Sequence, residues 1–215
     1  MNSDMSAGNS LDAMRQVYAR YLIYFIWVNV LLVMGTAWWV GTVSLVTVCG
    51  ASLLLGAAAT GTWVKFGCGT ETRVATAVSL AGLVALFVAS LATDNPATSF
   101  QLDGHMYFFA VLAILAGWVD WRALVAYAGV VAVHHLAFNF VLPWAVFPNG
   151  ADLVRVIFHA TIVVAEVAAL WWVVDRLSQA FSMASMAQTE AEASQVQAAA
   201  LQDSENARMQ EEREK

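Results

Sequence analysis

The stretch LVRVIFHATIVVAEVAALWWVVD, residues 153–175, decides the fold class of this chain. It is almost wholly apolar, and about 20 such residues in a helix cross the hydrocarbon core of a membrane. After Arg176 the composition changes to Ala, Gln, Glu, Ser and Met, without Gly or Pro. Because nothing there breaks a helix, we expect this span to continue as one cytoplasmic helix. A weakly encoded coiled coil and a disordered tail are the alternatives.

The rest of the chain supports a membrane setting. Of its 215 residues, 60% are hydrophobic and 12% are charged, whereas soluble domains carry about 25% charge. The fold class predicted is therefore all-α, a polytopic membrane protein with a six-transmembrane-helix bundle and a C-terminal cytoplasmic helix or coiled coil. The predicted domains are a cytoplasmic N-terminal segment at 1–17, a transmembrane domain at 18–176 and a helical linker at 177–215. Besides 153–175, the spans predicted are 18–39, 42–63, 74–93, a short fourth at 104–119, and 123–142.

The distribution of Lys and Arg predicts the orientation. Cytoplasmic loops of membrane proteins are enriched in these residues. With both termini inside a bacterial inner membrane, only Arg155 lies in an outer position. The basic residues that flank the spans on the cytoplasmic side are Arg15, Arg20, Lys65, Arg73, Arg122 and Arg176.

Charge and cysteine content exclude some functions. The net charge is −6, and the ten Lys and Arg form no basic patch, so we expect no nucleic-acid partner. Cys49 and Cys68 belong to no CxxC motif, and we interpret both as unpaired thiols.

Four histidines, His105, His134, His135 and His159, lie in the last three predicted spans. By helical rise, all four fall in the outer half of the membrane. Ionisable residues at such depth are costly and usually functional, although interhelical hydrogen bonding is an alternative role. His134 and His135 point about 100° apart on a helix, so both can hardly serve one metal. We prefer His135, which shares a face with Asn139.

Polar residues near these histidines extend the predicted site. Asp152, Arg155, His159 and Glu166 share one stripe of the sixth span. Arg155 can pair with Asp103 or Asp152, or hold an anionic group of a ligand. Asn139 can supply a hydrogen bond that fixes a histidine tautomer.

Two kinds of cofactor fit these side chains. Haem b takes two axial histidines between helices, with Arg155 near its propionates, and the apolar aromatic walls favour it. Copper bound by imidazoles, with a possible thioether from Met106, is the alternative, and zinc also accepts three histidines. The metal ligands predicted are His105, His135 and His159, and the wider cofactor site adds His134, Asn139 and Arg155.

The histidines belong to a longer ordered pattern of residues. It consists of Asp103-Gly-His105, Asp120-Trp-Arg122, His134-His135, Asn139, Leu142-Pro143, Phe147-Pro148, Arg155, His159 and Glu166. This order resembles the six-helix membrane sensor region of certain bacterial methyl-accepting chemotaxis proteins, and related regions precede diguanylate cyclase domains. The resemblance implies a sensor that is not an enzyme, a homodimer through the sixth span and its cytoplasmic helix, and a chemotaxis or cyclic-di-GMP output beyond residue 215.

Two other functions remain open from the residues. A membrane b-type cytochrome or quinone-reacting oxidoreductase also buries histidines, but all four here lie on one side of the bilayer. A transporter or proton channel could use Glu166 and the histidines as a relay. Transporters, however, tend to break helices at mid-membrane, and the three prolines here border outer loops.

Overall fold

The computed structural model of the chain describes residues 9–214. Residues 1–8 of the predicted N-terminal segment and Lys215 of the predicted linker lie outside the described residues. The described part is all-α, as predicted. Its α-helices are α1 (Asn9–Val40), α2 (Leu45–Phe66), α3 (Thr70–Ser90), α4 (Gln101–Leu115), α5 (Trp121–Val141) and α6 (Leu153–Arg213), with 3-10 turns at Pro96–Thr98, Ala116–Trp118 and Pro143–Ala145.

Five of these helices, α1, α2, α3, α5 and α6, are long and apolar enough to cross a membrane. Helix α4 has 15 residues, which corresponds to about 22 Å of rise, short of a core about 30 Å thick. It ends at Leu115, earlier than predicted, because a 3-10 turn follows and Val119 adopts a left-handed conformation with φ of 50°.

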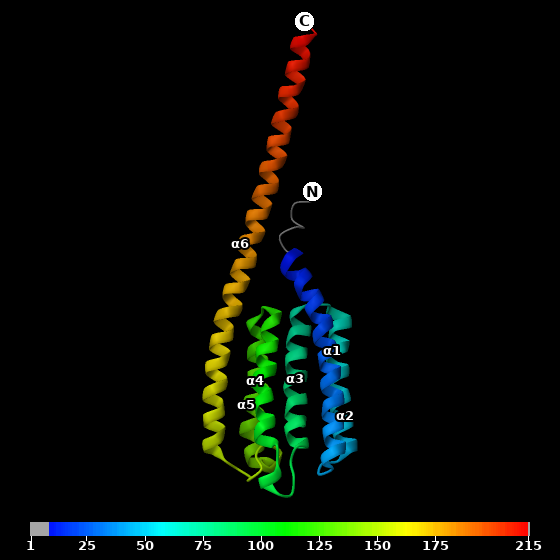
Figure 1. Cartoon of the computed structure of the whole chain (residues 1–215), viewed down its shortest axis with the longest axis vertical. Coiled ribbons are helices and arrows are strands. Elements are labelled where there is room, and N and C mark those ends of the chain that lie inside the picture. Colours follow the sequence, from blue (N-terminus) through cyan, green and yellow to red (C-terminus); the bar gives the residue numbers. More distant parts are fainter. Residues whose placement is uncertain (1–8, 215) are drawn as a thin grey trace. The chain divides into compact units, whose positions relative to one another are not determined.

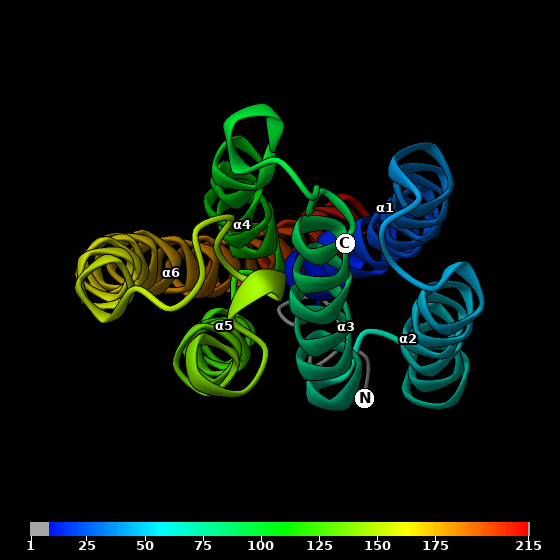
Figure 2. The same cartoon turned by 90° about the horizontal axis from the view of Figure 1, so that it is seen from below.

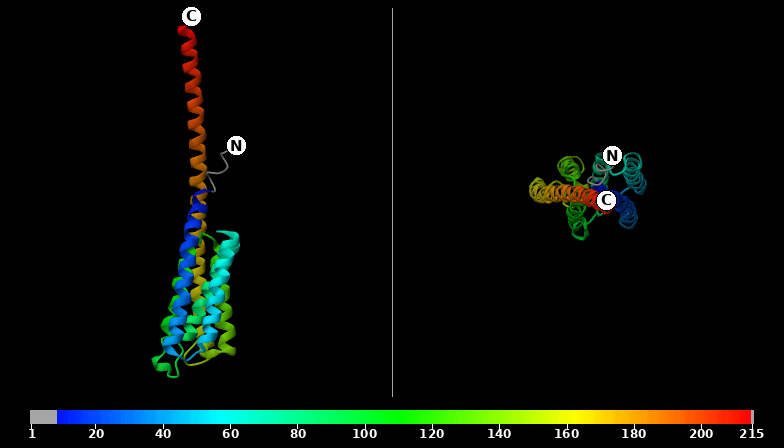
Figure 3. Two further views of the ribbon diagram at one scale, coloured as in Figure 1. Left: turned by 90° about the vertical axis from the view of Figure 1, so that its right-hand side faces the viewer. Right: turned by 90° about the horizontal axis from the view of Figure 1, so that it is seen from above.

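The structure divides into two units, and the larger one comprises Arg15–Arg176. Within it the helices run side by side (Figures 1 and 3). Helix α3 lies in the middle, with α1 and α2 on one side and α4, α5 and the membrane part of α6 on the other (Figure 2). The histidine-bearing helices therefore form their own half of this bundle.

The smaller unit contains the described residues of the two chain ends. There, α6 continues through Leu177–Arg213 without a break, so the predicted long C-terminal helix is confirmed. Its side chains are largely exposed, and Gln188 donates to Glu192 one turn later, at 3.0 Å.

An ion pair holds the short connection between α4 and α5. Arg73 of α3 lies 3.0 Å from Asp120, whose side chain is 5% exposed. Asp120 also caps α5, because its Oδ1 accepts from the backbone N–H of Arg122 at 2.9 Å. Arg15 of α1 donates to the carbonyls of Trp118 and Val119 at 3.1 and 2.9 Å. Helices α1, α3, α4 and α5 are thus joined at this end.

Close packing at Gly104 fixes the other end of α4. A Cβ atom there would lie 2.5 Å from Leu91 Cδ1 at the end of α3. A larger residue at this position would require the Leu91 side chain to move.

We predict that Asp120→Asn lowers the stability of the bundle by about 1–3 kcal/mol, because the partly buried Arg73 keeps its hydrogen bond to Thr70 but loses its ion pair. Asparagine keeps the helix cap, so the loss reports the ion pair rather than the cap. Thermal unfolding of the purified protein in one detergent measures it.

Asp94→Asn, in an exposed loop, is the matched control and should change the melting temperature little. Replacing both Arg73 and Asp120 with apolar residues should recover part of the loss. Equal melting temperatures for the Asp120 and Asp94 variants would contradict a structural role for the pair.

Candidate functional site

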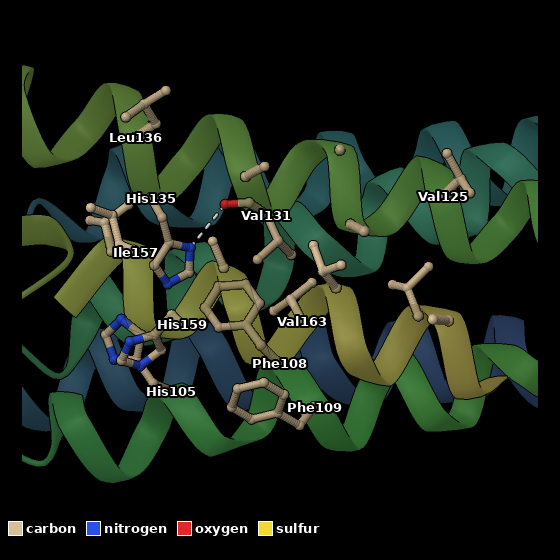
Figure 4. A pocket seen from close by; sticks show the side chains of 18 of the residues that line it. His105, Phe108, Phe109, Val125, Val131, His135, Leu136, Ile157, His159 and Val163 are labelled. Atoms are coloured by element: carbon tan, nitrogen blue, oxygen red, sulfur yellow. Dashed lines mark hydrogen bonds between the residues drawn. The ribbon is translucent and has the colours of Figure 1, made fainter. Parts of the chain in front are cut away.

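Three histidines from three helices meet in one cluster. His105 of α4, His135 of α5 and His159 of α6 have ring centroids 5.4 Å (His105–His135), 5.6 Å (His105–His159) and 5.7 Å (His135–His159) apart. Figure 4 shows the second nitrogen of His135 on the side of its ring that faces His105 and His159. His105 and His135 are buried and His159 is half-buried. We call these residues the three-histidine cluster.

Each ring of the three-histidine cluster is held by its own helix. The Nδ1 atoms lie 2.6, 2.9 and 2.8 Å from the backbone carbonyl oxygens of Gln101, Val131 and Arg155, four residues earlier in each case. A carbonyl oxygen only accepts, so each Nδ1 carries a hydrogen. In a neutral imidazole the Nε2 atom is then left with a free lone pair.

Two of these Nε2 atoms are buried and have no protein partner. Among the described residues, Nε2 of His105 and Nε2 of His135 are buried with no hydrogen-bond partner. A buried polar atom without a partner costs about 1–3 kcal/mol. The three-histidine cluster therefore contains two buried nitrogen atoms that could accept a hydrogen bond or bind a ligand.

The spacing of the rings is close to that around a single metal ion. Three imidazoles bound through Nε2 at about 2.0–2.1 Å, in trigonal or tetrahedral geometry, have ring centroids about 5–5.5 Å apart. The measured separations are 5.4–5.7 Å. Within residues 9–214, no group of three or more His, Cys, Asp or Glu side chains already stands around a common point as metal ligands would.

Two phenylalanines enclose the three-histidine cluster. Phe147 stacks on His105, with centroids 5.4 Å apart and planes 15° apart, and also contacts His135 and His159. Phe108 contacts His105 and His135 at 6.0 and 5.3 Å. These aromatic rings cover part of the three-histidine cluster.

Gln101 positions both His105 and the loop beside it. Its side chain is fully buried, and its Nε2 donates to the carbonyl of Trp144 at 2.8 Å. Its own carbonyl accepts from His105. Sequence analysis missed Gln101, Phe108 and Phe147 as site residues, because their roles depend on tertiary contacts that no spacing encodes.

His134 lies beside the three-histidine cluster but does not join it. Its ring stands perpendicular to that of His135, with centroids 5.1 Å apart, and packs against Phe108 and Phe138 at 5.7 and 5.2 Å. Within the described residues, neither of its nitrogens has a hydrogen-bond partner.

Asn139 and Arg155 organise the start of α6. Asn139 Oδ1 accepts from the backbone N–H of Asp152 at 2.7 Å. Arg155 forms an ion pair with Asp152 at 3.3 Å, and its guanidinium lies 5.5 Å from the ring centre of Phe147. Asp103 and Asp152 were both predicted as partners of Arg155, and the ion pair described here is with Asp152.

Glu166 lies farther along the His159 face of α6. It lines a cavity of about 520 Å³ with Met106, Phe109, Phe158 and His159. Its Oε2 is buried with no hydrogen-bond partner among the described residues. Met106, the thioether predicted as a possible ligand, lines this cavity together with His159.

Comparison of the chain with known protein families, curated proteins and solved structures found no match. Its own features therefore define its class: an all-α bundle with five helices able to span a membrane and three imidazoles converging from three of its helices.

We predict an unusual tautomer for the three-histidine cluster. In the metal-free protein at neutral pH, His105, His135 and His159 should carry their hydrogen on Nδ1, because each Nδ1 donates to a carbonyl. Solid-state nitrogen NMR in lipid, with assignments from single His→Gln variants, measures the tautomer. Rings protonated on Nε2 would contradict the arrangement described here.

Proposed function

We propose that this chain is a membrane-embedded sensor module that binds one transition-metal ion through His105, His135 and His159. The observation that carries the proposal is the set of Nδ1 bonds to backbone carbonyls, which leaves the Nε2 lone pairs available on three rings whose centroids are 5.4–5.7 Å apart. Metal-binding histidines commonly donate their other ring nitrogen to a carbonyl in this way.

Copper is the metal we favour. Imidazole suits both copper and zinc, and copper binds most strongly among divalent first-row ions. Three protein ligands leave a fourth position open, as in sites that bind a further ligand rather than purely structural ones. The ion would supply a Lewis-acidic or redox-active centre, and the chain would orient the rings and exclude water.

Haem b is the second candidate. A cavity of about 670 Å³ adjoins all three histidines, which is room on the scale of a large ligand. Against haem, two axial histidines hold the porphyrin plane between them. Here, a third ring lies within 5.7 Å of each member of any such pair and would occupy that plane. The three-ring arrangement supports a single ion better.

The proposed setting is the bacterial inner membrane with both termini cytoplasmic. It rests on the bias of Lys and Arg to one set of loops. Helix α4 completes six crossings by adding its 3-10 turn at Ala116–Trp118. The Arg73–Asp120 pair then lies at the cytoplasmic face and the three-histidine cluster toward the outer face.

The proposed signal path is α6. This helix carries His159 and continues without interruption to Arg213, so drawing its ring toward a metal acts on the same helix that forms the linker. A homodimer through α6 and an output for chemotaxis or cyclic-di-GMP signalling follow from the resemblance and are part of this proposal.

We predict that His105→Gln, His135→Gln and His159→Gln each weaken metal binding by at least about 100-fold, since losing a ligand should exceed the 10–100-fold effect of losing its outer partner. The wild-type chain in lipid nanodiscs should bind one copper. Metal analysis after loading with copper(II) at varied chelator concentrations gives the affinity.

His134→Gln is the matched control, since it makes the same change at the neighbouring residue and should leave copper binding intact. An absorption spectrum of protein expressed with haem precursors tests the second candidate. A Soret band that disappears with His135→Gln would favour haem b. Equal copper affinity in all four variants would refute the three-histidine assignment.

We also predict the orientation of the loops. In a Cys49→Ser background, Cys68 between α2 and α3 should react with a membrane-impermeant maleimide only in inverted membrane vesicles. Asn149→Cys in a background without natural cysteines should react only in intact cells. The reverse pattern would contradict the proposed topology.

A further inference from the structure

The three-histidine cluster forms one end of a long apolar cavity between α4, α5 and α6. The cavity has a volume of about 670 Å³, and its surface is almost entirely apolar. Figure 4 shows His105, His135 and His159 at one end and Val125 toward the other. Trp171, which stacks on Trp121 with centroids 4.8 Å apart, also lines it.

This cavity borders the surface that would face lipid. Among its lining residues, Leu136 of α5 and Ile157 and Val164 of α6 are exposed. In a membrane their surroundings are acyl chains, so molecules dissolved in the hydrocarbon reach the cavity without crossing water.

Phe147 covers a different side of the rings. It is buried and packs against all three imidazoles, and it is not among the residues that line the cavity. His159 also lines the separate cavity that contains Glu166. All three imidazoles line the apolar cavity, so a molecule inside it would reach the rings directly.

We propose that small uncharged molecules soluble in lipid, of the class of carbon monoxide, nitric oxide and dioxygen, reach the three-histidine centre through this cavity. The inference rests on the proposed function, because it needs the bound ion. Three protein ligands leave one position for such a molecule. Anions are excluded, because moving an unpaired charge through apolar surroundings is costly.

The test uses the full chain in lipid nanodiscs, loaded with copper(I), and carbon monoxide as the probe. We expect one carbon monoxide per copper, seen as a single infrared stretching band, with rebinding after photolysis that can be timed. Azide added to the copper(II)-loaded protein should leave its absorption and electron paramagnetic resonance spectra unchanged.

Two variants decide whether the cavity is the route. Ala132→Phe fills it from α5 and should slow carbon monoxide rebinding about tenfold or more, equivalent to roughly 1.4 kcal/mol on the barrier, with copper loading unchanged. Ala137→Phe, exposed on the same helix and outside the cavity lining, should rebind at the wild-type rate. Ala168→Phe against Ala169→Phe on α6 repeats the comparison if Ala132→Phe does not fold.

The outcomes separate the two proposals. Failure of the wild-type chain to bind copper refutes the proposed function. Copper binding without carbon monoxide binding, azide binding at the copper, or equal rebinding rates in the filled and control variants overturns the inference about the cavity while leaving the metal site in place.

Discussion

The hydrogen bond from histidine Nδ1 to the carbonyl four residues earlier is the interaction on which this site depends. It occurs in α4, α5 and α6 with the same local geometry. Because donor and acceptor belong to one helical turn, each helix orients its own imidazole before any tertiary contact forms. Packing of the helices then brings together three imidazoles whose orientations are already set by these bonds. Gly104, which lets α4 approach Leu91, and Gln101, which holds Trp144, carry out that step for His105.

Other polar groups of the bundle also find partners within or between helices, as a membrane requires. Thr36 and Ser90 donate to carbonyls four residues earlier, and Tyr107 of α4 donates to Asn29 of α1 at 2.7 Å. The nitrogens of His105 and His135 are among the buried polar atoms without a partner in the described part of the chain. Their rings are also neighbours, with centroids 5.4 Å apart.

The sequence was sufficient for the fold class and insufficient for the geometry of the site. Hydropathy indicated the apolar helices, and the absence of Gly and Pro after Arg176 indicated the long C-terminal helix, because both depend on local chemistry. The early end of α4 depends on the left-handed conformation of Val119, a β-branched residue that gives no such signal. Phe147 belonged to the residue pattern that carries the family resemblance, but its contact with the imidazoles could not be predicted, since it reaches them from the α5–α6 connection, which has no periodicity.

The membrane segment of α6 combines the highest mean hydropathy of the candidate spans, 2.0, with the least burial, 6%. A helix of that kind enters a bilayer on its own composition, and lateral association with its neighbours is a separate, later equilibrium. The Trp121–Trp171 stack, the contacts of His159 and the packing of Arg155 on Phe147 are among the side-chain links that oppose its separation. The composition of α6 therefore favours its insertion, whereas its docking depends on a small number of side chains.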